Sequence, residues 1–293
     1  MGKTEEKMIS WINSHILFIA TAFVIFSALW MRLAGRNYMG IDYHFSLYDL
    51  PGNCNSFLFR RFTGFAMDRW PDYTILLLKA IAYLGDFGVA LLTCFLLRER
   101  MTAPAHLQFF LVLTACLLSP VSLLYSVVGL RIDSVCLCIL LLGRLLCQKG
   151  RLLLSLLIMA AAAFLLPACW PIVIFLSIYE IKQHNTAGRI DPKTILFFLL
   201  LLSILIFSIF LENRDIANGY FWGKIFVIDP ATGTFFNGFL EWLSAMVRVY
   251  GYFLAMSALL LSFRHRKLRI PALGIHLLVL MLIGWYQTRH FAL

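Results

Sequence analysis

Long apolar stretches separated by short polar turns dominate the pattern of this chain. Residues 107–118 and 195–210, for example, are almost uninterrupted apolar runs. A helix of about 20 mostly apolar residues is needed to cross the hydrocarbon core of a bilayer. The pattern therefore predicts an all-α protein, a polytopic bundle of transmembrane helices.

We expect about nine spans, several of them short for a bilayer crossing. They cover residues 11–33, 73–97, 105–127, 132–147, 151–166, 168–181, 194–211, 240–262 and 271–287. Prolines at 167 and 171 leave open whether 151–181 is one long helix or two segments. No small-residue cleavage site follows the first run, which predicts a retained helix rather than a signal peptide. We treat residues 1–293 as a single integral membrane domain, because the polar segments are too short for a soluble one.

Composition and charge sharpen this picture. The chain is 61% hydrophobic and only 14% charged, whereas soluble domains carry about a quarter charged residues. The net charge of +10 comes from Lys and Arg at the ends of apolar runs, which argues against a nucleic-acid partner. Short loops rich in Lys and Arg are typical of the cytoplasmic side. We therefore expect a cytoplasmic N-terminus, an external C-terminus, and a location in a bacterial cytoplasmic membrane or the endoplasmic reticulum membrane.

The first outer loop contains a basic, aromatic-rich segment at residues 56–70. Such a composition is typical of a helix that lies in the membrane interface, where Arg60 and Arg61 would meet lipid phosphates. An aromatic belt with snorkelling arginines is an equally valid interpretation.

Two opposite charges stand two residues apart in "GLRIDS" at residues 129–134, a short turn between apolar runs. We expect this turn at the outer membrane surface, where Arg131 and Asp133 avoid the cost of a charge at the bilayer centre. Ionisable groups at several outer span ends form a candidate functional site. Its members are Asp42, Arg131, Asp133, Arg289 and His290.

Two further ionisable residues, Lys79 and Asp86, lie seven positions apart within the second predicted span. This spacing places them on one helix face, and we expect them to pair with other helices. The cysteines fall mostly in apolar segments, where they are expected to act as small buried hydrophobes. The common phosphate-loop, zinc-protease and serine-hydrolase motifs are absent from the sequence.

Several short motifs occur in a characteristic order. They are "GIDYH" at 40–44, "WPDYT" at 70–74, "LLKAIAYLGDFGVA" at 77–90, "GLRIDS" at 129–134 and "QTRHFAL" at 287–293. Together they resemble the multi-span GT-C glycosyltransferases that use polyprenyl-phosphate sugars. The resemblance is best over residues 10–180, whereas residues 181–293 are only weakly assigned.

The resemblance implies a transfer reaction on the outer or lumenal face. A polyprenyl-phosphate sugar in the membrane would be the donor, and Asp42 would accept the proton of the attacking hydroxyl. Arg131 and Arg289 would face the donor phosphate, with Arg60 and Arg61 as further cations. Asp133 would help to position the acceptor substrate or hold Arg131, and His290 would help to bind substrate. A divalent metal is compatible with this chemistry, although no ligand set is recognisable.

Other functions stay open. The turn lacks the Trp and Gln common in these enzymes, and Leu165 stands where a Lys is often found. These differences are consistent with a non-catalytic GT-C-like subunit, or a lipid-binding scaffold that works with a membrane-protein partner in an envelope or glycoconjugate assembly complex. A small transporter is a third interpretation, but it predicts paired repeats with broken helices, and no convincing repeat is present.

Overall fold

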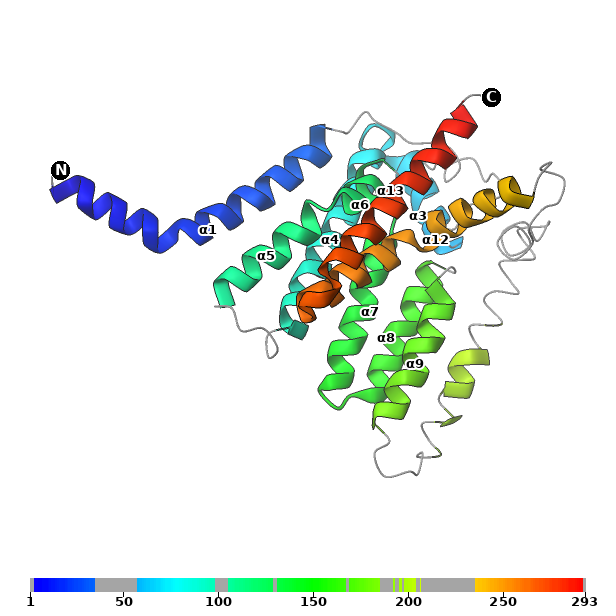
Figure 1. Ribbon diagram of the computed structural model, residues 1–293. Helices are drawn as coiled ribbons and strands as arrows, with labels where there is room; N and C mark the ends of the chain where they lie inside the picture. The colour runs from blue at the N-terminus through cyan, green and yellow to red at the C-terminus, as the bar shows by residue number, and fades with distance from the viewer. Residues whose placement is uncertain are drawn as a thin grey trace.

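The computed structural model is built from helices (Figure 1). It describes residues 3–34, 57–97, 105–128, 131–166, 169–184 and 235–291, together with a few helical residues between 192 and 206. Those residues contain no strand, which confirms the all-α prediction. The predicted apolar segments all contain a helix, except that 194–211 is described only in part.

The long elements follow the apolar runs closely. They are α1 (Lys3–Ala34), α3 (Phe57–Arg69), α4 (Thr74–Leu97), α5 (Ala105–Leu117), α7 (Asp133–Gln148), α8 (Leu152–Leu165), α9 (Trp170–His184), α12 (Phe235–Arg264) and α13 (Arg269–Phe291). Short turns join or extend them, namely η2 (Pro71–Tyr73), α6 (Pro120–Leu123), η3 (Leu124–Val128) and η6 (Arg266–Leu268). Of these, η3 is a single wide turn of π-helix.

Three described helices are long and apolar enough to cross a membrane: His15–Ala34, Pro71–Leu97 and Arg266–Trp285. A fourth crossing results if His106–Leu117 and Pro120–Ser126, which are bent by 45° at their break, act together. The short α8 shows why the number is smaller than expected, because its 14 residues extend only about 21 Å. The protein therefore has the helices of a membrane protein, while a nine-span arrangement stays a prediction.

Helices α4 and α7 run parallel and pack closely through glycine. A Cβ at Gly85 would stand 2.6 Å from Oγ of Ser134, and one at Gly88 would stand 2.5 Å from Sγ of Cys138. The hydroxyl of Ser134 also donates a 2.9 Å hydrogen bond to the carbonyl oxygen of Ala82. The missing side chains let α7 approach α4 closely enough to make this hydrogen bond, which fixes the position of the turn before α7.

Helices α7 and α8 form an antiparallel hairpin that turns at Gly150, whose φ of +76° favours glycine. Ser155 donates a 2.7 Å hydrogen bond across the hairpin to the carbonyl oxygen of Gly143. At the far end of α7, Arg144 forms an ion pair with Glu180 of α9 and lies over the ring of Tyr179. These contacts join α8 and α9 to α7 on the carboxyl-terminal side of the turn that contains Arg131.

The helix ends fall on two sides of the molecule. In Figure 1 the ends of α1 and α13 lie on the upper side, whereas the α7–α8 turn and the start of α5 lie lower. Helices α4, α5, α7, α8 and α9 therefore alternate in direction, as expected for a chain that crosses a membrane repeatedly. The assignment of the lower side to the cytoplasm stays a prediction.

Candidate functional site

Arg131 and Asp133 form a buried, two-point ion pair. Nε of Arg131 lies 2.7 Å from Oδ2 of Asp133, and Nη2 lies 3.0 Å from Oδ1. Such a fork of parallel hydrogen bonds is the strongest geometry available to an arginine and a carboxylate. Asp133 is also the first residue of α7, where the helix dipole favours a negative charge. The pairing of these two residues agrees with the close spacing seen in the sequence.

Tyr125 of η3 holds the same arginine from another side. The guanidinium carbon of Arg131 lies 5.1 Å from the centre of the Tyr125 ring, a cation–π distance. The backbone N–H of Arg131 donates a 3.1 Å hydrogen bond to the carbonyl oxygen of Tyr125. Burial of a charge is costly unless the charge is paired and hydrogen-bonded, and here both conditions are met.

The depth of this turn is set by its contacts with α4. The contacts of Ser134 with Ala82 and of α7 with Gly85 place it about 12–17 Å along α4, a helix about 36 Å long. The turn therefore lies beside the interior of α4 and not beyond its end, while its position at the outer membrane surface stays a prediction. The reason is that α7 begins part-way along α4. Arg131 and Asp133 avoid the desolvation cost by pairing with each other rather than by reaching water.

A second buried ion pair lies on the neighbouring helices. Nη2 of Arg32, near the end of α1, lies 2.6 Å from Oδ2 of Asp86, in the middle of α4. The arginine also donates to Oγ of Ser122 at 3.0 Å and to the carbonyl oxygen of Ala28 at 3.0 Å. Both charged side chains are almost completely buried, with exposures of 1% and 0%. The prediction that Asp86 pairs with another helix is confirmed.

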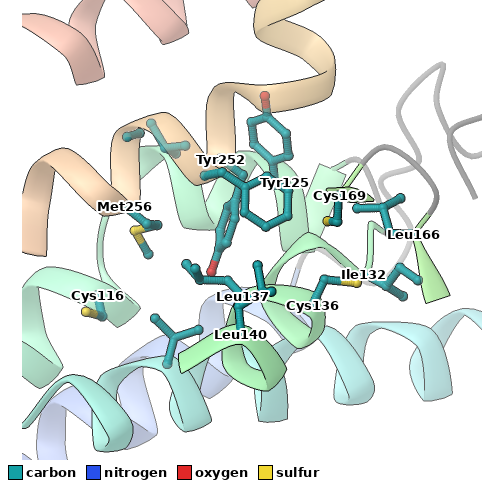
Figure 2. Packing of buried hydrophobic residues seen from close by; sticks show 14 of the residues in the cluster. Cys116, Tyr125, Ile132, Cys136, Leu137, Leu140, Leu166, Cys169, Tyr252 and Met256 are labelled. Atoms are coloured by element: carbon teal, nitrogen blue, oxygen red, sulfur yellow. The ribbon is translucent and has the colours of Figure 1, made fainter. Parts of the chain in front are cut away.

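Two tyrosines bring the ion pairs together. The hydroxyl of Tyr252, on α12, donates a 2.8 Å hydrogen bond to Oδ1 of Asp86. Its ring lies 5.7 Å from the ring of Tyr125, which in turn lies beneath Arg131. Figure 2 shows the two tyrosines side by side among buried residues from α7 and α12. The site is thus one continuous buried network that spans α1, α4, η3, α7 and α12.

The described residues include only part of the predicted site. Asp42 lies outside the described residues. Arg60 and Arg61 belong to α3, and Arg289 and His290 belong to the last turns of α13, but their side chains also lie outside what is described. Among the predicted site residues with described side chains, Arg131 and Asp133 lie in contact.

Three members of the network were not predicted from the sequence, namely Arg32, Tyr125 and Tyr252. An arginine at the end of an apolar run also has the appearance of an interfacial anchor, so its position alone does not mark Arg32 as part of a site. The tyrosines stand in apolar segments as ordinary core residues would. One available signal was that Arg32 is a basic residue at the outer end of a predicted span, the side that the positive-inside rule leaves poor in basic residues.

Within the described part of the chain, no group of three or more His, Cys, Asp or Glu side chains could hold a metal ion. The six cysteines described there are free thiols, buried or partly buried. This agrees with their expected role as small core residues. The described site consists of two buried arginine–carboxylate ion pairs and the two tyrosine rings between them.

No protein-family model, curated protein or solved structure matches this chain.

Proposed function

We propose that this protein is a multi-pass membrane glycosyltransferase of the GT-C type, which moves a sugar from a polyprenyl-phosphate donor to an acceptor on the outer or lumenal face. The observation that carries the proposal is the buried Arg131–Asp133 fork, which stands in the "GLRIDS" turn that resembles a motif of those enzymes. The apolar helices support a lipid-borne donor, because such a donor is already dissolved in the membrane.

In the proposed reaction, an acceptor hydroxyl oxygen forms a bond to the anomeric carbon of the donor sugar. The bond from that carbon to the phosphate oxygen breaks, and the polyprenyl phosphate leaves with the electron pair. Asp42 takes the proton of the hydroxyl. Arg131 stabilises the phosphate charge, since a planar guanidinium suits phosphate geometry. Asp133 orients Arg131, and Arg289 and His290 would complete the binding of substrate.

A membrane-bound scaffold that binds the same lipid without catalysis is the second candidate. It is favoured by the way Arg131 and Asp133 already bind each other within the protein interior, an arrangement that also suits a purely structural turn. Both candidates place the protein in a bacterial cytoplasmic membrane or the endoplasmic reticulum membrane. They differ in whether Asp42 acts as the base that accepts the proton of the acceptor hydroxyl.

Binding and transfer should be measured on the purified full chain in lipid nanodiscs, with polyprenyl phosphate as the binding probe and its sugar-loaded form as donor. We expect Arg131→Gln to lose binding and transfer, and Arg131→Lys to keep part of both, because lysine cannot make the two-point contact. Arg144→Gln is the matched control, since Arg144 is also paired with a carboxylate and lies over a tyrosine, but at the other end of α7.

Asp42→Asn separates the two candidates. An enzyme should lose transfer and keep lipid binding, whereas a scaffold should show no transfer in any variant. Unchanged transfer in both Arg131→Gln and Asp42→Asn would overturn the catalytic assignment.

A further inference from the structure

Tyr125, which lies beneath the guanidinium of Arg131, packs against helix α12. The phenol hydroxyl of Tyr125 donates a 2.7 Å hydrogen bond to the backbone carbonyl oxygen of Val247 on α12. Tyr125 is 4% exposed, so its ring is enclosed by protein. Arg131 contacts this residue through both its guanidinium and its backbone N–H, so the position of Tyr125 bears directly on that of Arg131.

Gly251 makes this approach to α12 possible. A Cβ at this position would stand 2.6 Å from the hydroxyl oxygen of Tyr125 and 3.1 Å from Cγ1 of Val279 on α13. The absence of a side chain lets the tyrosine reach the backbone of α12. The helix therefore supports Tyr125 at its hydroxyl end through Val247 and along its ring through Tyr252.

Tyr252 is itself fixed by the other ion pair. It is completely buried, and its hydroxyl donates to Asp86, whose second oxygen accepts from Arg32. Asp86 thus binds one group from α1 and one from α12. A hydrogen bond to a buried charged group is stronger than one between neutral groups, and its loss leaves a costly unsatisfied acceptor.

We infer that Tyr252 and Asp86 are positioning residues that set the orientation of Arg131 through the ring of Tyr125. The described contacts run from Arg32 to Asp86, to Tyr252, to Tyr125 and to Arg131, and each step is a hydrogen bond, an ion pair or a ring contact. Both residues are fully buried, so neither is expected to touch the lipid phosphate. The consequence for lipid binding rests on the proposed function, whereas the coupling of the two ion pairs does not.

Coupling is tested by double-variant cycles on thermal unfolding of the full chain in detergent. Tyr252→Phe keeps the ring and removes only the hydroxyl. Side chains without a shared contact give additive effects, so non-additivity between Tyr252→Phe and Arg131→Gln reports a link through Tyr125. We expect the fall in Tm of the double variant to be smaller than the sum of the single falls. Tyr252→Phe with Arg144→Gln is the control pair, and its two falls in Tm should be additive. If the falls in Tm are additive in both pairs, the inference is overturned.

Lipid binding gives a readout that a purely structural link would not move. We expect Tyr252→Phe and Asp86→Asn to weaken binding of polyprenyl phosphate roughly three- to tenfold. Tyr179→Phe, a change to the tyrosine beneath Arg144, should leave binding unchanged. If Tyr252→Phe binds polyprenyl phosphate as tightly as the wild-type protein does, the positioning role is overturned. A wild-type protein that binds no polyprenyl phosphate would instead overturn the proposed function, and the cycles would still decide the coupling.

Discussion

The hydroxyl of Tyr252 lies 2.8 Å from Oδ1 of Asp86, although 166 positions separate the two residues in the chain. This contact joins α12 to α4 in the interior of the helix bundle. It also completes the hydrogen bonding of a carboxylate that is fully buried and already paired with Arg32. A single polar cluster therefore joins α12 to α1 and α4.

Breaking this cluster from one side should destabilise the protein strongly. Removal of one partner from a buried ion pair costs about 3–5 kcal/mol, because the other charge is left without compensation. We expect Asp86→Leu to show a loss of this size in the free energy of unfolding, measured with denaturant in detergent micelles. The double variant Asp86→Leu with Arg32→Met should recover much of it, since no lone charge remains. A double variant as unstable as the sum of the single variants would contradict this account.

Gly251 should tolerate no larger residue. Gly251→Ala would push a methyl group against the Tyr125 hydroxyl at 2.6 Å, and overpacking of this kind costs about 1–3 kcal/mol. Thermal unfolding measures the effect. Gly274→Ala is the matched control on α13, because no atom lies within 4 Å of a Cβ there and alanine suits a helix better than glycine. Equal Tm values for the two variants would show that the close approach at Gly251 is unimportant.

Helix α3 should lie at the membrane interface with its aromatic face outward. Thr63 and Ala66 are buried against the protein, whereas Phe65 is 60% exposed and Trp70 is 50% exposed. Its 13 residues extend only about 20 Å, too little to cross a bilayer. A nitroxide label at position 65 should therefore be relaxed by oxygen dissolved in lipid, and a label at exposed Asp72 should respond more to a water-soluble nickel complex. A label at 65 that responds only to the nickel complex would contradict an interfacial position.

The two ends of the bundle should face opposite compartments. In a cysteine-free background, cysteines placed at Lys182 and at Arg264, both exposed at helix ends, should be labelled from the cytoplasmic side of sealed vesicles. A cysteine at position 42 should be labelled only from the other side. Arg151, exposed at the α7–α8 turn, gives a third position that should behave like 264. Labelling of positions 42 and 264 from the same side would reverse the predicted topology.

Three features could be predicted from the sequence: the helical segments, the membrane character and one contact of the site. Hydrophobic runs and polar turns report where a helix begins and ends, because those depend on residues close in the chain. Arg131 and Asp133 are only two positions apart on a tight turn, so their pairing follows from local geometry. The burial of Asp86 also followed, since a charged residue inside an apolar helix must find a partner.

The identity of that partner and the depth of the site along α4 depend on how the helices pack. Helical periodicity shows which face of α4 is buried, but it carries no information on which of the other helices meets that face. Arg32, Tyr125 and Tyr252 come from segments far apart in the chain, and they meet because α1, η3 and α12 pack around α4 and α7. The depth of the Arg131 turn depends on Gly85 and Gly88, whose missing side chains let α7 pack beside the interior of α4. These relationships are set by packing between helices, which no local pattern in the sequence records.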